Sequence, residues 1–536
     1  MYTSVFNAKV YLRRGEFAQA VLIKGDCIAA AGSNDAVKRL APGGTRRIDA
    51  GGGLLLPGFY DCHLHLSMVG GRARAINVQG VASLDALIER CRGELPKFAG
   101  NAVIAGRGYN QELFSDEKRF PNRHDLDKVS VRQALIISRV CGHVVSCNSK
   151  ALELAGLDSA ESLKMGKAAA FDPAMIDTDA SGNPLGVFRE NAASLIRELI
   201  PPPDAAGKKD AIEHGMGEAL RHGVTAAASM DTNGVDFDDT LRAYKSVIEG
   251  GGPKIRVTLQ CGIKREPENI ACYLDRGLKT GSELIGGWLK FGPLKFFADG
   301  SLGGRTAWLR RPYHDDPSTF GIPAEKAEVL EDLFVKAHRG GFQIVVHAIG
   351  DAALDMVLSG YEKITAPGSN PLRHSALHCQ ITDMPLLRRM GDNHILALVQ
   401  PGFLKTDRLI LRDRVGGALA STSYAWGAME KLGIRTAYGT DCPVQPINPL
   451  EGIASAVGRE GGFYPEHSVD TYTAVDAYTA GSAYANFDEN RLGRIAPGLL
   501  ADMVLLDKDI FTLPPEAIPS AAVCWTMSGG EMAYGA

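Results

Sequence analysis

Two histidines separated by one residue, His63 and His65 in PGFYDCHLHL, stand at the end of an apolar run. Side chains two positions apart on a strand point to the same face, so the two imidazoles can share one cation. An HxH pair alone is a weak signal, because two buried histidines that donate to carbonyl groups show the same spacing. The interpretation therefore depends on which other residues the fold brings beside them.

The elements that would position these histidines are short apolar or β-branched runs, each followed by a segment of helical periodicity. This alternation is typical of an α/β protein with a parallel sheet. Eight such runs predict a closed (β/α)8 TIM barrel over residues 57–487. The runs are LLLPGFYDCHLH, GVTAAASMD, IRVTLQCG, PLKFFADG, FQIVVHAIGD, HSALHCQ, ILALVQPG and IRTAYGTDCP.

Catalytic groups of such barrels lie at the C-terminal ends of the strands. His63 and His65 end the first run, His347 the fifth and His378 the sixth. Asp441 ends the eighth run, which is next to the first run in a closed barrel. A carboxylate buried there without a cation would be costly, so these residues together favour a metal site on the barrel rim.

Lys295, in PLKFFADG, is the unusual residue on this rim, because its strand parity with Phe297 and Asp299 directs it into the barrel. Two interpretations are open. The lysine can pair with Asp299 or another carboxylate, or its amine can carry carbon dioxide as an anionic carbamate that bridges two cations. The residues alone favour the ion pair.

The rest of the chain is predicted to form two additional parts. Residues 1–56 and 488–536 both contain short strand-like segments broken by turns, which predicts one composite β-sandwich built from both chain ends. Roughly 140 residues separate the first barrel run from the second, too many for one crossover, so an α/β insertion is expected at about 70–205. Within it we expect a helix that begins near Asn148 or Ser149 and a hairpin around SGNP, and we expect the insertion to cover the barrel mouth.

Composition excludes several classes of partner. With 58 basic and 62 acidic residues and no long run of one sign, the chain has no electrostatic footprint for nucleic acid. The first residues lack the pattern of a basic segment followed by an apolar one, and the sequence has no apolar stretch of about 18 residues, so we expect a cytoplasmic protein that does not enter membranes. A small-molecule substrate is expected, and a homo-oligomer is compatible with the sequence. The ten cysteines are sparse and are expected to be reduced.

The chain resembles the amidohydrolase superfamily, and within it the YtcJ-like branch that includes N-substituted formamide deformylases. Eight segments carry the resemblance in the order of the family, and they cover nearly the whole length. They are LLLPGFYDCHLHL, GHVVSCNSKALELAGL, SGNPLGVFRE, GVTAAASMD, LKFFADGSLGGRTAWL, VVHAIGDAALD, GTDCPV and NRLGRIAPGLLADMVLLD.

The resemblance implies a barrel with a composite β-sandwich and a binuclear metal site. One cation would take His63, His65 and Asp441. The second would take His347 and His378, and a carbamate on Lys295 would bridge the two. The mixture of imidazole and oxygen ligands suits Zn²⁺ best, with Mn²⁺, Fe²⁺ or Co²⁺ as alternatives.

Two positions depart from the family pattern. Leu377 stands where the family commonly has Glu before the sixth-strand histidine, and Cys141 stands where Asp often precedes the glycine of GH. Leu377 has the opposite strand parity to His378, so we expect it to face away from the metals. Cys141 is expected to affect the choice of substrate.

The expected activity is hydrolysis of a non-peptide carbon–nitrogen bond, in an amide such as an N-acyl or N-formyl amine. Attack by a metal-activated hydroxide is expected, with Asp441 as general base. His143 would hydrogen-bond the substrate carbonyl or its oxyanion, and Arg305 and Trp308 would contact the substrate. Alternatives are deamination of a cyclic amidine, ester hydrolysis or decarboxylation at the same site, or a metal-binding regulatory protein without turnover.

Overall fold

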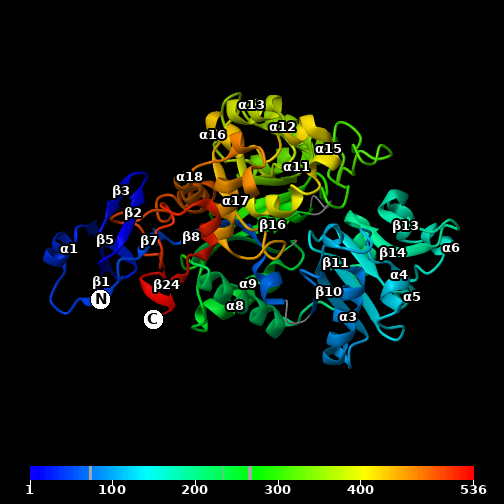
Figure 1. Cartoon of the computed structure of the whole chain (residues 1–536), viewed down its shortest axis with the longest axis horizontal. Helices are drawn as coiled ribbons and strands as arrows, with labels where there is room; N and C mark the ends of the chain where they lie inside the picture. Colours follow the sequence, from blue (N-terminus) through cyan, green and yellow to red (C-terminus); the bar gives the residue numbers. More distant parts are fainter. Residues whose placement is uncertain (72–74, 233, 264–267, 536) are drawn as a thin grey trace.

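The computed structural model describes residues 1–71, 75–232, 234–263 and 268–535. Figure 1 shows a central barrel with a smaller part at either end of the molecule. The first (blue) and last (red) segments of the chain lie together at one end, and the insertion (cyan) lies at the other. Among the described residues, no helix combines the length and the hydrophobicity needed to cross a membrane.

The central sheet contains a strand from each of the eight predicted runs. Its strands follow the order β22-β21-β20-β19-β18-β16-β15-β8, and every neighbouring pair along this path is parallel. The strands are β8 Phe59–Leu64, β15 Val224–Thr232, β16 Arg256–Gly262, β18 Leu289–Phe297, β19 Ile344–Ala348, β20 Ser375–His378, β21 Leu396–Val399 and β22 Thr436–Tyr438. A short strand, β17 Glu283–Ile285, pairs antiparallel with β18.

Hydrogen bonds just beyond β22 join the two ends of this sheet. The backbone nitrogen of Asp441 donates to the carbonyl oxygen of His63 at 2.8 Å, and that of His65 donates to the carbonyl oxygen of Cys442 at 2.8 Å. The eight parallel strands therefore form a nearly closed barrel, and His63 and Asp441 meet where it closes. This arrangement agrees with the predicted TIM barrel.

Helices of the βα units cover the outside of the barrel. Helix α9, Phe237–Glu249, shows why: Phe237, Tyr244 and Val247 recur at helical spacing and are buried, whereas the acidic residues of its first turn are exposed. The other helices are α8 Ala205–Arg221, α10 Glu268–Asp275, α11 Ala327–Arg339, α12 Asp351–Ile364, α13 Met384–Asp392, α14 Leu404–Asp407, α15 Leu411–Ala420, α16 Trp426–Lys431, α17 Pro449–Gly462, α18 Thr471–Asp476 and α19 Ser482–Ala485.

The first predicted run, LLLPGFYDCHLH, is two strands rather than one. Strand β7, Leu54–Pro57, belongs to a sheet of the chain ends, and β8 begins the barrel. Gly58 lies between them. A Cβ atom at this glycine would stand 2.1 Å from Oγ1 of Thr225, so the change of direction requires a residue without a side chain.

Strands from both ends of the chain combine in two sheets. One has the order β5-β4-β1-β6 and the other β25-β24-β23-β7-β2-β3. Val5 and Val21 of the first sheet pack with Leu55, Met503 and Trp525 of the second in one apolar core. The strands are β1 Tyr2–Phe6, β2 Lys9–Arg13, β3 Glu16–Ala18, β4 Ala20–Lys24, β5 Cys27–Gly32, β6 Arg46–Asp49, β23 Met503–Leu506, β24 Val523–Ser528 and β25 Glu531–Tyr534, with helix α1 Asn34–Leu40 after β5.

The insertion between β8 and α8 has a mixed sheet of its own, in the order β13-β14-β12-β11-β10-β9. The predicted helix is present as α5, with Asn148 as its N-cap, and SGNP lies in the predicted hairpin between β13 and β14. The elements are α2 Leu66–Gly70, β9 Ile76–Asn77, α3 Leu84–Glu94, β10 Val103–Tyr109, α4 Arg123–Asp127, β11 Ala134–Arg139, β12 Val144–Cys147, α5 Ser149–Ala155, α6 Ala160–Leu163, β13 Ile176–Thr178, β14 Pro184–Arg189 and α7 Ser194–Arg197.

Candidate metal centre and its cavity

The HxH pair of β8 meets Asp441 at the junction where the barrel closes. Nε2 of His63 lies 3.4 Å from Oδ1 of Asp441, and Nε2 of His65 lies 3.1 Å from the same oxygen. One ligand atom from each residue falls within 4.8 Å of the other two. Two imidazole nitrogens and a carboxylate oxygen at this spacing are a donor set that fits a divalent cation.

His347 and His378 lie beside this group, on neighbouring strands β19 and β20. Their ring centres are 4.4 Å apart, and the ring of His378 lies 6.1 Å from that of His63. The backbone of His378 has φ 78° and that of Asp441 has φ 52°, in a left-handed region that residues with side chains rarely adopt. Such strain is often concentrated at functional sites, and here it sits at two of the predicted ligands.

Each of these four histidines has one ring nitrogen engaged by a fixed acceptor. Nδ1 of His63 lies 2.6 Å from Oε1 of Gln260, and Nδ1 of His378 lies 2.6 Å from Oε1 of Gln400. Nδ1 of His65 faces the carbonyl oxygen of Met230 at 2.9 Å, and Nε2 of His347 faces that of Gly300 at 2.9 Å. The nitrogen that faces an acceptor carries the ring proton, so the other nitrogen of each ring is available to bind a cation. These available nitrogens are Nδ1 of His347 and Nε2 of His63, His65 and His378.

We expect Gln260→Leu or Gln400→Leu to weaken metal binding by about 10- to 100-fold, the usual cost of losing such a partner. The leucine removes the acceptor that fixes the imidazole proton but keeps a similar volume. Competition with a chromophoric chelator measures the affinity without any enzyme assay. Gln260→Glu keeps an acceptor and should preserve affinity. Unchanged affinity in both leucine variants would contradict the assigned role.

Lys295 lies in the barrel interior on β18 with 1% of its surface exposed. Its Nζ donates to the carbonyl oxygen of Phe296 at 3.2 Å and lies 3.8 Å from the centre of the Phe297 ring. Within the described part of the chain, no carboxylate lies within 4.0 Å of this nitrogen. The pairing with Asp299 is therefore absent, because Asp299 accepts from the backbone N–H groups of Trp308, Ile349 and Gly350.

At five of the six predicted ligands, burial and local charges favour the protonation state that a metal requires. The exception is His65: burial would lower its pKa, but the hydrogen bond and charge of Asp441 outweigh burial and raise it. Burial lowers the pKa of His63, His347 and His378 well below the ordinary value, so these rings are neutral. Burial also lowers the pKa of Lys295, to about 7. Burial alone would raise the pKa of Asp441, but its hydrogen bond with His65 and the nearby His63 and Lys295 outweigh that effect and lower it. The carboxylate is therefore ionised.

His143 lies at the edge of the site together with a carboxylate that sequence reasoning missed. Its ring centre is 4.9 Å from that of His347, and its Nδ1 lies 2.7 Å from Oε2 of Glu190. Burial would lower the pKa of His143, but the Glu190 charge and hydrogen bond raise it to about 9. Glu190 is the last residue of SGNPLGVFRE, one of the segments that carry the family resemblance. Its place in that segment is the feature of the sequence that could have marked it as a site residue.

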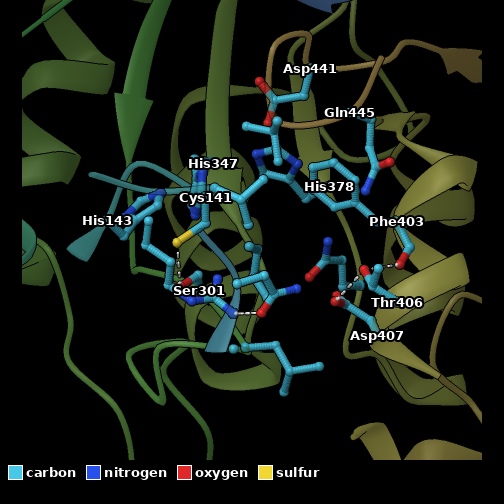
Figure 2. Close-up of a pocket in the computed structure, with 18 residues that line it drawn as sticks. Cys141, His143, Ser301, His347, His378, Phe403, Thr406, Asp407, Asp441 and Gln445 are labelled. Atoms are coloured by element: carbon cyan, nitrogen blue, oxygen red, sulfur yellow. Dashed lines mark hydrogen bonds between the residues drawn. The ribbon is translucent and has the colours of Figure 1, made fainter. Parts of the chain in front are cut away.

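These residues open into a cavity between the barrel and the insertion, with a volume of about 510 Å³ including its mouth. Figure 2 shows Asp441, His347 and His378 on one side of it, Cys141, His143 and Ser301 on another, and Thr406 and Asp407 on a third. Cys141, one of the two departures from the family pattern, thus lines the cavity, and its Sγ lies 3.4 Å from Oγ of Ser301.

Arg305 and Trp308, the predicted substrate contacts, do not line this cavity. The Arg305 guanidinium pairs with Asp315 at 2.9 Å, and the Trp308 backbone nitrogen donates to Asp299. Both belong to the long loop after β18. The loop supports the site through Asp299 instead of offering these two side chains to a ligand in the cavity.

Leu377, the other departure, faces a different way from the prediction. It packs in one cluster with Cys62, Val345, Leu398 and Ala437, which come from four other barrel strands. Strands on different sides of a barrel meet only in its interior, so Leu377 points inward and lies beneath the histidines. Strand parity failed here because the left-handed φ of His378 breaks the alternation at that residue.

The sequence profile of the Amidohydrolase family matches residues 46–534. The chain belongs to the amidohydrolase family. It is 31% identical to the putative amidohydrolase YtcJ of Bacillus subtilis strain 168 over 98% of this chain and 97% of that protein. It is 24% identical to the N-substituted formamide deformylase of Arthrobacter pascens, again over 98% and 97% of the two chains.

This amidohydrolase also resembles solved structures over nearly its whole length. A crystal structure of an uncharacterized metal-dependent hydrolase from Pyrococcus horikoshii OT3 superimposes with a TM-score of 0.76 and 26% identity, over 96% of this chain and 99% of the other. The likeness includes the insertion and the chain ends as well as the barrel, since so little of either chain is left out. The predicted family and barrel are thereby confirmed.

Proposed function

We propose that this amidohydrolase is a metal-dependent hydrolase that cleaves the carbon–nitrogen bond of a small amide. The observation that carries the proposal is the meeting of His63, His65 and Asp441 at the barrel junction, with the His143–Glu190 pair at the same cavity. The names of the relatives support it, since one is a metal-dependent hydrolase and another a formamide deformylase.

The residues present fit two divalent cations. His63, His65 and Asp441 would hold one, and His347 and His378 would hold the other. Lys295, buried beside them without a carboxylate partner, would carry a carbamate shared between the two. Zn²⁺ suits this mixture of imidazole and oxygen donors best, and Mn²⁺, Fe²⁺ and Co²⁺ are the alternatives.

A divalent cation supplies polarisation of a carbonyl oxygen and lowers the pKa of water to roughly 7. The protein residues perform the proton transfers. Asp441, ionised and beside both histidines, accepts the proton of the attacking water and passes it to the nitrogen of the amide. The water oxygen bonds to the carbonyl carbon as the carbon–nitrogen bond breaks, and a carboxylic acid and an amine leave.

His143 stabilises the negative charge that develops on the carbonyl oxygen. Its Nδ1 donates to Glu190, which holds the ring in place and keeps it protonated, so the other ring nitrogen can donate to the substrate. Glu190 is itself buried, and its Oε1 has no hydrogen-bond partner in the described part of the chain. This carboxylate therefore acts through His143 as a positioning residue.

Glu190→Gln should lower kcat by about 10²- to 10³-fold, comparable to the loss of one oxyanion donor, because His143 loses the charge that keeps it protonated. Steady-state kinetics with the best amide of a panel, at several pH values, measure the effect. Glu198→Gln is the matched control, since Glu198 lies in the same insertion and its side chain is 61% exposed. Equal kinetics for Glu190→Gln and wild type would refute the assignment.

A panel of N-formyl, N-acetyl and longer N-acyl amines, assayed with protein saturated in Zn²⁺ or Mn²⁺, tests the proposed function. We expect release of the free amine, and loss of that release after chelation. Three other results would assign a different reaction, provided that no amide is hydrolysed. They are release of ammonia from a cyclic amidine, of an alcohol from an ester, or of carbon dioxide. Absence of all turnover with metal bound would reject catalysis.

A further inference from the structure

The tip of the β11–β12 hairpin, residues 139–143, carries three polar side chains to the cavity. Arg139 ends β11, and Cys141 and His143 follow it before β12 begins. His143 has a role in the proposed reaction. Arg139 has none, although it lines the same cavity and only 5% of its surface is exposed.

The Arg139 guanidinium is held by neutral groups. Its Nε donates to Oε1 of Gln111 at 2.8 Å, and its Nη2 donates to Oδ1 of Asn110 at 3.0 Å. Across the residues described by the structure, no carboxylate lies within the 4.0 Å of an ion pair. Burial lowers the pKa of Arg139, but nearby groups, including Cys141 and Asp407, outweigh burial and keep the guanidinium charged. Because none of the described carboxylates is within ion-pair distance, an anion that enters the cavity can pair with this charge directly.

Glycine at position 303 leaves room for this guanidinium. A Cβ atom on Gly303 would stand 2.2 Å from Nη2 of Arg139, so any other residue would displace the side chain. Gly303 also lines the cavity, and its carbonyl oxygen accepts from Nε2 of Gln111, the amide that holds Arg139. The arginine is thus fixed in advance at the cavity wall, an arrangement that reduces the entropy lost when a ligand binds.

The electrostatic surroundings favour a negative group at this wall. Burial raises the pKa of the Cys141 thiol, but the charges of Arg139 and His143 outweigh burial and lower it. Asp407 lies on another side of the cavity in Figure 2, and its Oδ2 accepts from the Tyr424 hydroxyl at 2.5 Å. Asp407 interacts with the charge of Arg139 at longer range, but it forms no ion pair with Arg139 within 4.0 Å.

We propose that Arg139 binds a carboxylate of the substrate, and that the preferred substrates are small amides bearing a carboxylate, such as N-formyl or N-acyl amino acids. This inference rests on the proposed amide hydrolysis at the same site. The planar guanidinium matches a planar carboxylate and discriminates against a neutral amide at that position. The cavity extends from the rim histidines to this wall, since His347, His378 and Arg139 all line it, so one small molecule can contact both.

The test compares matched pairs of substrates, each an N-formyl or N-acetyl amino acid and its C-terminal carboxamide, on wild type, Arg139→Gln and Arg139→Lys. We expect wild type to prefer the acid, and Arg139→Gln to lower kcat/KM for the acid by about 10- to 100-fold while changing that for the carboxamide less than about threefold. Arg139→Lys should keep part of the preference. Arg132→Gln, an exposed arginine of the same insertion, is the control.

Equal turnover of acid and carboxamide by wild type would overturn the inference and leave the proposed hydrolysis standing. A parallel loss on both substrates in Arg139→Gln would also overturn it, because that pattern indicates a structural role. Failure of wild type to hydrolyse any amide would instead reject the proposed function. Isothermal titration of the N-formyl amino acids would then decide on Arg139, since binding that disappears in Arg139→Gln supports the carboxylate site and unchanged binding rejects it.

Discussion

Replacement of Asp441 by Asn lowers kcat by about 10²- to 10⁴-fold, the range expected for loss of a general base, and leaves an oxygen donor in place. The carboxylate is buried and ionised, with two imidazoles within 3.4 Å. Asparagine keeps the side-chain carbonyl oxygen but cannot accept a proton from water. Turnover should therefore fall far more than metal content, which is measured by elemental analysis of the purified protein.

Asp239→Asn is the matched control for this experiment, because Asp239 is a carboxylate with 64% side-chain exposure on α9, outside the barrel. We expect it to resemble wild type in both kcat and metal content. If Asp441→Asn bound metal normally and turned over the best amide at the wild-type rate, the proton transfer would have to be assigned to another group.

Replacement of Lys295 by Ala should abolish detectable hydrolysis and halve the bound metal, and added short-chain carboxylic acids should restore part of the activity. The wild-type amine is buried without a carboxylate partner, and burial favours its neutral form, which is the form that adds carbon dioxide. Alanine leaves a space at the position where the proposed carbamate would lie. A small carboxylate that enters this space would supply two oxygens in place of those of the proposed carbamate.

Lys290→Ala is the control that distinguishes loss of the proposed carbamate from the loss of stability caused by removing any buried lysine. Lys290 lies on the same strand, but it pairs with Asp488 at 2.6 Å, far from the rim. We expect Lys290→Ala to lower thermal stability and to show no response to carboxylic acids. Full metal content in Lys295→Ala, or an equal response of both variants to the acids, would exclude the carbamate.

The barrel could be predicted from the sequence because its strands and helices appear there as a repeating pattern of apolar residues. Each of the eight runs is apolar, short and followed by a helical pattern, and the structure uses all eight as neighbouring parallel strands. The strand ends then place His63, His347 and Asp441 on one rim, since parallel strands of a barrel share the direction of their C-terminal ends. Local spacing and topology together were enough for this part of the site.

Other features depended on geometry that no spacing encodes. The inward direction of Leu377 follows from the left-handed backbone at His378, and the splitting of the first run follows from the tight approach of Thr225 to Gly58. Glu190 and Arg139 come from the insertion, whose packing against the barrel is a long-range contact. Residues on loops, such as Arg305 and Trp308, could not be oriented by strand parity, and neither lines the cavity.

The hairpin tip at residues 139–143 has a consequence for how this amidohydrolase could change over time or by engineering. The groups proposed to recognise the substrate come from the insertion, whereas the groups proposed to hold metal come from barrel strands and the turns that follow them. Members of both sets line the same cavity, but the two sets do not lie on the same strands. If the proposed roles hold, exchange of the hairpin for one of another length or sequence would change the range of substrates and leave the proposed metal ligands in place. Substrate range and reactivity could then diversify separately.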